Sequence, residues 1–137
     1  DPKKIDTKIL NNFFKQKTIP VIAPMGIDSK GQVYTVNADT AAGTIANQIK
    51  AERLLLMTDV PGVNDKNGNL ISQLSTKQAL DLIEDGTITG GMIPKIKTCI
   101  SAIESGVNGV VIIDGRKSHA VLFDLFSNLG AGTLIVK

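Results

Sequence analysis

The stretch "RLLLMTDV", residues 53–60, has four consecutive apolar residues after an arginine and then runs into a polar turn. A near-continuous apolar run of this length is typical of a β-strand that is covered on both faces. The stretch "GVVIID", residues 109–114, predicts a second fully buried strand for the same reason. Such strands occur in sheets that carry helices on both sides, so the two stretches together indicate an α/β protein.

Helical patterns alternate with these strands. We expect helices over residues 5–16, 39–51, 75–86, 94–106 and 118–130. Asp39 and Ser75 are the expected N-caps of the second and third helices, and Gly86 and Gly106 follow the third and fourth as terminators.

Shorter segments complete the predicted architecture. We expect a short buried strand over residues 19–25, one arm of a hairpin at 33–36 and a last strand at 132–137, while Asn67-Gly68 is a strong hairpin signal. The alternation predicts a layered α/β/α domain, with a mainly parallel open sheet and antiparallel hairpins. The length of 137 residues fits a single domain over 1–137.

Composition excludes several classes of function. A net charge of +2, four Phe, one Tyr and no Trp offer little to a nucleic acid. The single Cys99 and the single His119 exclude an internal disulfide and a Cys/His zinc site, so we expect no metal ligands of that kind. No apolar run has the length of a membrane span, and no signal peptide is recognisable, which predicts a cytoplasmic protein without membrane contact.

Polar loops follow three of the predicted strands, at residues 37–39, 58–64 and 114–119. Ligands of open α/β sheets bind beyond the carboxyl ends of the strands. The three loops therefore predict one composite site.

The stretch "TITGGMIPK", residues 87–95, places Gly90 and Gly91 ahead of a helix and Lys95 near its start. Backbone N–H groups and the helix dipole can bind a phosphate there, and Lys95 can add a full positive charge. The spacing differs from that of a P-loop, and the alternative is a glycine turn before a proline-initiated helix with Lys95 in solvent.

Other polar residues of these loops also have a structural alternative. Asp39 is either an N-cap or a residue of the cleft that it shares with Asn37. Asp59 either orients a ligand or forms an Asx turn with the bend that follows it. His119 has a structural or capping role, and Cys99 belongs to the core. No Ser-His-Asp or Cys-His pair can be built on this one histidine.

Together, four motifs resemble those of the acetylglutamate kinases of the amino-acid kinase family. In chain order they are "VNADTAAG" (36–43), "LLLMTDVPGV" (54–63), "ITGGMIPK" (88–95) and "IIDGRKSHAVLFDLF" (112–126), the last followed by "GAGTLI". The resemblance covers nearly the whole chain and corresponds to the carboxyl-terminal, nucleotide-binding half of these enzymes. It implies transfer of the γ-phosphoryl group of ATP, with Mg²⁺, to the side-chain carboxylate of N-acetyl-L-glutamate, an early step of arginine biosynthesis.

The resemblance also implies roles for individual residues. Lys95 neutralises charge on the transferring phosphoryl group, Asp39 holds catalytic lysines in position, and Asn37 and Thr35 lie at the amino-acid substrate. The nucleotide pocket is formed by Asp59, Val60, Pro61, Gly62, Val63, Asn64, Thr87, Ile88, Thr89, Gly90, Gly91 and Met92. By similarity to arginine-inhibited members, His119, Asp124 and Gly130 are candidate effector residues.

Two departures from the family pattern change the expectation. The family's amino-terminal substrate-binding domain, with its own phosphate-binding lysine and glycine pair, has no counterpart in residues 1–137, so we expect no useful activity from this chain alone and a homo-oligomer for the full-length protein. Many members have asparagine where this chain has Thr35. This leaves room for a kinase of glutamate, carbamate or aspartate, and a non-catalytic nucleotide- or effector-binding module is the third alternative.

Overall fold

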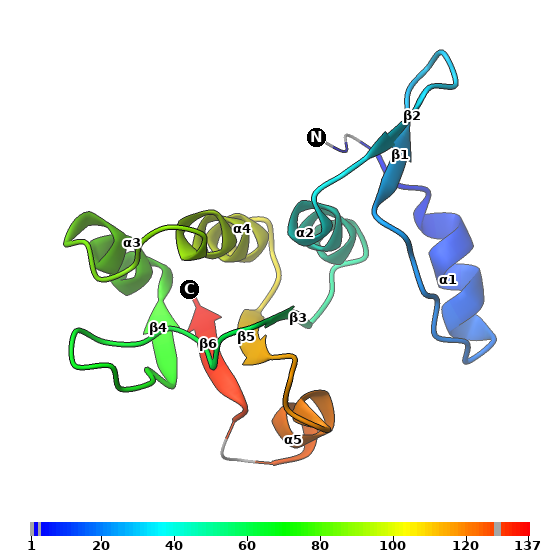
Figure 1. Ribbon diagram of the computed structural model, residues 1–137. Helices are drawn as coiled ribbons and strands as arrows, with labels where there is room; N and C mark the ends of the chain where they lie inside the picture. The colour runs from blue at the N-terminus through cyan, green and yellow to red at the C-terminus, as the bar shows by residue number, and fades with distance from the viewer. Residues whose placement is uncertain (1, 3, 128–129) are drawn as a thin grey trace.

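The computed structural model describes residues 2, 4–127 and 130–137 as an α/β fold (Figure 1). The elements in chain order are α1 (Thr7–Lys15), β1 (Met25–Ile27), β2 (Val33–Thr35), α2 (Ala38–Gln48), β3 (Arg53–Thr58), β4 (Gln73–Ser75), α3 (Thr76–Glu84), α4 (Met92–Glu104), β5 (Gly109–Asp114), α5 (Ala120–Phe126) and β6 (Gly132–Val136).

Four strands form the central sheet in the order β3-β5-β6-β4. β3 is parallel to β5 and β4 is parallel to β6, whereas β5 and β6 are antiparallel. β1 and β2 form a separate antiparallel hairpin. The prediction of a mainly parallel sheet with antiparallel hairpins is confirmed. The register pairs Thr58 with Asp114, so that β3 and β5 end side by side.

Helices cover both faces of this sheet (Figure 1). α2, α3 and α4 lie on one face, where Ile96, Cys99 and Ile103 of α4 are buried against Val110 and Ile112 of β5. α5 lies on the other face, where a smaller cluster is built around Val111, Ile113 and Ala120. Alternate residues of β5 therefore face two cores, because successive side chains of a strand point to opposite faces. The layered α/β/α arrangement is the predicted one.

The helix ends follow from local chemistry. Ser75 and Gln78 form a reciprocal capping box at the start of α3. Gly86 and Gly106 have φ angles of 77° and 108°, the left-handed region that favours glycine after a helix. α2 differs from the prediction, because its N-cap is Asn37 and not Asp39. The N-cap lies two residues earlier than expected, which releases the Asp39 side chain from capping.

The strand expected over residues 19–25 is wrong. Only Met25 of this stretch is in a strand, and Val21 is 98% exposed. Pro20 and Pro24 have no backbone N–H to donate to a neighbouring strand. The apolar pattern is real, but the described part of the chain provides no sheet for it.

Three further features differ from expectation: the burial of β3, the presence of β4 and the end of α5. β3 is buried on one face only, with Met57 52% exposed, because it is the edge strand of the sheet. β4 is three residues long and was absent from the prediction. α5 ends at Phe126, short of the expected helix over 118–130, of which residues 128 and 129 lie outside the described part.

Candidate functional site

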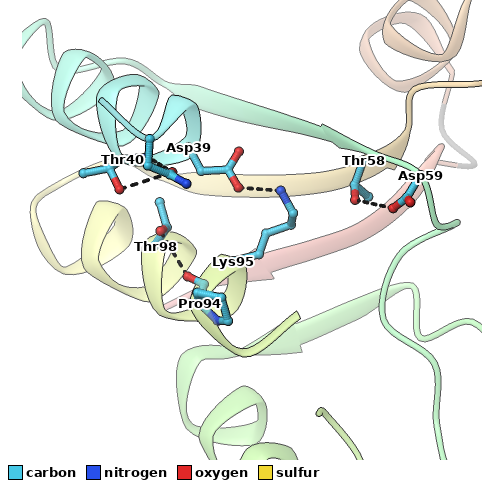
Figure 2. A network of polar contacts seen from close by, with 8 residues as sticks. Asp39, Thr40, Thr58, Asp59, Pro94, Lys95 and Thr98 are labelled. Carbon is cyan, nitrogen blue, oxygen red and sulfur yellow. Dashed lines mark hydrogen bonds and ion pairs between the residues drawn. The ribbon is translucent and has the colours of Figure 1, made fainter. Parts of the chain in front are cut away.

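The topology brings the starts of two helices to the edge of the sheet where β3 and β5 end. α2 precedes β3 and α4 precedes β5, and each helix runs back over the sheet in the opposite direction to its strand (Figure 1). Figure 2 shows this edge, with Asp39 of α2, Lys95 of α4 and Thr58-Asp59 at the end of β3. The carboxyl edge of parallel strands is where α/β proteins bind ligands.

An ion pair joins the two helices at this edge. Lys95 Nζ lies 2.5 Å from Asp39 Oδ2. The side chains are 14% and 29% exposed, so both charges are partly removed from water. Charges in such a place are stabilised by each other and become costly when one is removed. Of the two readings of Lys95, the solvated lysine is wrong, since the ammonium group is bound.

Asn37 and Thr35 lie just before α2 in the chain. Asn37 Oδ1 accepts from the backbone N–H of Thr40 at 3.1 Å and thereby caps the helix. Thr35 is exposed in β2. The segment before residues 37–39 is β2, one arm of the separate hairpin, as the sequence predicted. Asp39 nevertheless reaches the carboxyl edge, through α2.

Hydrogen bonds to Thr133 of β6 fix the loop after β3. The Thr133 hydroxyl accepts from the backbone N–H of Val63 at 2.8 Å and donates to the carbonyl of Ile71 at 2.7 Å. Gly62 has φ 148°, and a Cβ there would lie 2.6 Å from Thr133 Oγ1. Val63 is 2% exposed and packs in the core. Thr133 therefore fixes this loop, a role that the sequence analysis missed.

The remaining residues of this loop reach the surface. Asp59 is exposed and accepts at 3.3 Å from the hydroxyl of Thr58. Val60 and Pro61 are half-buried, and exposed Asn64 pairs with Leu70 in an isolated antiparallel bridge. The bridge closes the turn that the Asn67-Gly68 signal predicted. Asp59 is thus the charged side chain that this loop presents to solvent.

The segment before α4 is ordered by Asp85. This carboxylate accepts from the hydroxyl of Thr87 at 2.5 Å and from its backbone N–H at 2.9 Å. These bonds from Thr87, and then Lys66, lower the pKa of Asp85 to about 2. Ile88 is buried in the core, whereas Thr89 is exposed.

The paired glycines leave the start of α4 open. Gly90 has φ 55°, and Gly91 takes the N-cap position without a side chain to bond the helix. A Cβ at either glycine would meet no atom within 4 Å. Half-buried Met92 begins the helix. The backbone N–H groups of Met92 and Ile93 donate to the carbonyls of Thr89 and Gly90 at 3.3 and 3.2 Å, and Pro94 has no N–H. An anion at this helix start would therefore be bound by the backbone of Gly90 and Gly91.

A second charged pair lies at the same edge, in the loop at residues 114–119 that was predicted to belong to the site but whose aspartate and arginine had no assigned roles. Asp114, at the end of β5, accepts from Arg116 Nε and Nη2, both at 2.9 Å. The Asp114 side chain is 5% exposed, against 64% for Arg116. These hydrogen bonds, together with one from the Arg116 backbone N–H, lower the pKa of Asp114 to about 2. The signal in the sequence was an aspartate that ends a buried strand, two residues before an arginine.

The candidate effector residues separate into two groups. His119 and Gly130 are exposed and line a pocket of about 670 Å³ beside α5, together with Phe123 and Phe126. His119 stands before α5 with φ 60° and makes no side-chain capping bond. Asp124 is buried and does not line this pocket. Its carboxylate accepts hydrogen bonds from Arg53 Nη1 and from the Ala131 backbone N–H, each at 3.3 Å.

Cys99 is fully buried in the core, as predicted, and desolvation raises the pKa of its thiol to about 12. Across residues 2, 4–127 and 130–137, no three His, Cys, Asp or Glu side chains are grouped as metal ligands. In the same part of the chain, no helix has both the length and the hydropathy needed to cross a bilayer.

Comparison with known proteins gives close relatives over the whole chain. It is 59% identical to the acetylglutamate kinase of Bradyrhizobium diazoefficiens over 137 residues, which are 100% of this chain and 46% of the relative. It is 58% identical, with the same coverage, to the acetylglutamate kinase of Rhodopseudomonas palustris strain BisB18. The chain thus spans about half the length of these curated relatives.

Solved structures share the fold. The N-acetylglutamate synthase of Neisseria gonorrhoeae, complexed with coenzyme A and L-arginine, matches 98% of this chain and 31% of its own, with TM-score 0.92 and 29% identity. Giardia lamblia carbamate kinase bound to AMP-PNP matches 95% of this chain and 48% of its own, with TM-score 0.71 and 17% identity, a likeness of fold alone. The profile of the Amino acid kinase family matches residues 1–114. The chain belongs to the amino-acid kinase family.

Proposed function

We propose that this chain is the nucleotide-binding half of an ATP-dependent kinase that phosphorylates the side-chain carboxylate of N-acetyl-L-glutamate. The observation that carries the proposal is the Lys95–Asp39 ion pair at the carboxyl edge of the sheet. The proposal is supported by the 59% identity to an acetylglutamate kinase, which extends over all 137 residues of the chain.

Transfer of a phosphoryl group to a carboxylate depends on charge stabilisation and positioning more than on proton transfer. Negative charge spreads over the transferring phosphoryl group, and a fixed ammonium group such as that of Lys95 stabilises it. Asp39 holds this ammonium at the edge through the 2.5 Å contact. The acceptor carboxylate is already ionised at neutral pH, so that no general base is required. His119, the one histidine of the chain, lies beside α5 and has no part in this step.

The nucleotide is assigned to the space between two segments, residues 59–64 after β3 and residues 87–92 before α4. Exposed Asp59 can accept hydrogen bonds from ribose hydroxyls. The open backbone at Gly90 and Gly91 suits the phosphates. Mg²⁺ fits as a companion of the phosphate oxygens. In the described residues no three carboxylate, imidazole or thiol side chains gather to bind it without the nucleotide.

An exposed apolar face supports the assignment of this chain as one of two domains. The face is formed by α1, the following segment and the β1–β2 hairpin, which lie to one side of the sheet (Figure 1). Its side chains, between 44% and 98% exposed, are Ile9, Phe14, Ile19, Val21, Met25, Ile27 and Tyr34. Exposed apolar side chains that gather on one part of a fold mark an interaction site. We assign it to the amino-terminal, acetylglutamate-binding domain that makes up the rest of the relatives' length.

A complementation experiment tests the function. The chain is mixed with the amino-terminal part of the Bradyrhizobium diazoefficiens kinase. ATP-dependent phosphorylation of N-acetylglutamate is then measured and compared with that of glutamate, carbamate and aspartate. We expect no turnover from the chain alone and turnover with acetylglutamate from the mixture. Mg·AMP-PNP titrated into the chain alone should bind. No binding and no complementation would contradict the proposal. The full-length enzyme is expected to be a cytoplasmic homo-oligomer.

A second function, feedback by arginine, is favoured by the pocket beside α5. The pocket is lined by exposed His119, by Gly130 and by two phenylalanines, and has room for a ligand of amino-acid size. Arginine titrated calorimetrically into the complemented enzyme, with His119→Ala as the variant, tests this function. No heat at millimolar arginine would contradict it. Asp124 is assigned to the fold and not to the ligand, since Arg53 already occupies its carboxylate.

A further inference from the structure

A second cation lies at the same edge of the sheet as Lys95. Arg116 follows β5 by two residues, and β5 ends beside β3. The backbone N–H of Gly115 donates to the carbonyl of Thr58 at 2.8 Å, which ties the loop that carries Arg116 to the residue before Asp59. The two loops therefore form one surface beyond the strands.

The guanidinium of Arg116 is held in one orientation. Asp114 accepts from Nε and Nη2 at 2.9 Å each, which directs Nη1 away from Asp114. Asp114 is 5% exposed and fixed by the end of β5, whereas the arginine is 64% exposed. A buried carboxylate thus presents an arginine to solvent. The loss of side-chain entropy on binding is reduced for a group that is already oriented.

Arg116 lies beside the loop that is assigned to the nucleotide. Asp114 and, more weakly, Asp59 raise the pKa of Arg116, so Asp59 lies within electrostatic range of the guanidinium. Asp59 belongs to the loop assigned to the nucleotide. Lys95 supplies a single charge, already shared with Asp39, whereas a nucleoside triphosphate carries several. The planar fork of an arginine matches phosphate oxygens better than an ammonium does.

We propose that Arg116 is a phosphate-binding residue of the nucleotide site and that Asp114 is the positioning residue that aims it. The assignment rests on the proposed function, since it needs the nucleotide between residues 59–64 and 87–92. In this arrangement Arg116, after β5, binds the phosphate chain, and Lys95, on α4, binds the transferring phosphoryl group. Asp59 is left for the ribose.

The test separates phosphate binding from loop structure by comparing two ligands. Mg·AMP-PNP and adenosine are each titrated into the 137-residue chain, by calorimetry and by NMR shift changes respectively. Arg116→Ala should weaken Mg·AMP-PNP by about tenfold or more, the usual effect of a charge-assisted hydrogen bond, and should leave adenosine affinity unchanged. Arg116→Lys should recover part of the loss, and Asp114→Asn should weaken Mg·AMP-PNP selectively while keeping the charge of Arg116.

The charge-matched control is Lys97→Ala, an exposed lysine on α4 that should leave both affinities as in the parent. Parent-like Mg·AMP-PNP binding by Arg116→Ala overturns the proposal. So does an equal loss of adenosine binding, which would make the arginine a structural support of the loop. If the unchanged chain binds neither ligand, the proposed nucleotide site fails first, and this outcome is distinct from the other two.

Discussion

The ammonium group of Lys95 lies 2.5 Å from the carboxylate of Asp39, and this ion pair joins the first turns of α4 and α2 (Figure 2). The two residues are 56 positions apart in the chain and meet because both helices begin at the carboxyl edge of the sheet. The pair fixes the position of a positive charge, which is what transfer of a phosphoryl group requires.

Lys95→Ala should lower kcat of the complemented enzyme by about 100-fold or more, since it removes the charge that we propose stabilises the transferring group. Asp39→Asn should lower kcat by a smaller factor, because the ammonium remains but is no longer held. Steady-state kinetics with both substrates measure this effect. Turnover by Lys95→Ala within a few-fold of the parent would show that Lys95 belongs to the fold alone.

Thr133→Val should destabilise the chain by about 1–3 kcal/mol, because the buried N–H of Val63 and carbonyl of Ile71 lose their shared partner. Thr133→Ser is the matched control, since it keeps the hydroxyl and removes only a methyl group. Urea unfolding of the three proteins measures the difference. Equal losses for valine and serine would mean that Thr133 acts by packing and not by its hydrogen bonds.

Several features of the fold could be read from residue patterns. The apolar stretch at 109–114 is buried along its whole length, and Ser75 and Gln78 form the capping box that such a pair favours. These features depend on neighbours in the chain. Asp39 shows the limit of the same reasoning. Its type and place predicted an N-cap, but Asn37 caps α2, and the role of Asp39 depends on a lysine from a distant helix.

Features that depend on which elements become neighbours could not be predicted locally. The strand pattern at 19–25 needs a sheet that the described residues do not supply, so Val21 is exposed. The apolar run at 53–57 reads as buried on both faces, yet β3 is an edge strand. The role of Thr133 was missed because it comes from tertiary hydrogen bonds, which leave no periodic signal. Asp114 begins a loop that was predicted to belong to the site, but its burial and its bonds to Arg116 could not be read from the pattern.

Gly132→Ala should destabilise the chain by about 3 kcal/mol, since a Cβ there would lie 1.9 Å from the carbonyl oxygen of Ile112 in the neighbouring strand. Backbone atoms of a central strand cannot move aside cheaply. Gly91→Ala is the control, because a Cβ at Gly91 meets nothing within 4 Å and its φ of −64° suits alanine. Thermal unfolding compares the two variants, and equal melting temperatures would contradict the packing of β5 on β6.

The thiol of Cys99 should resist alkylation in the native chain. It is fully buried, and desolvation raises its pKa to about 12, so almost none is thiolate at pH 8. Iodoacetamide labelling followed by mass spectrometry should show modification only after denaturation. Native labelling at the rate of a free cysteine would place Cys99 at the surface and contradict the core on that face of the sheet.

The Asp114–Arg116 pair should make stability depend on acid pH. The pKa of Asp114 is lowered to about 2 in the folded chain, chiefly by hydrogen bonds from Arg116, against about 3.9 for an unperturbed aspartate. A depressed folded-state pKa stabilises the fold above the unfolded value, and this contribution is lost as pH falls through the folded value. Asp114→Asn lacks it at every pH.

The gap in melting temperature between the parent and Asp114→Asn should therefore be largest above about pH 5 and should narrow from about pH 4 towards pH 2. Asp81→Asn, which removes the same charge from an exposed position on α3, is the matched control. A scan of melting temperature against pH on all three proteins measures the effect. A gap that stays constant or widens as the pH falls would show that the carboxylate of Asp114 is not stabilised by Arg116 in solution, and would remove the pre-oriented guanidinium on which phosphate binding by Arg116 depends.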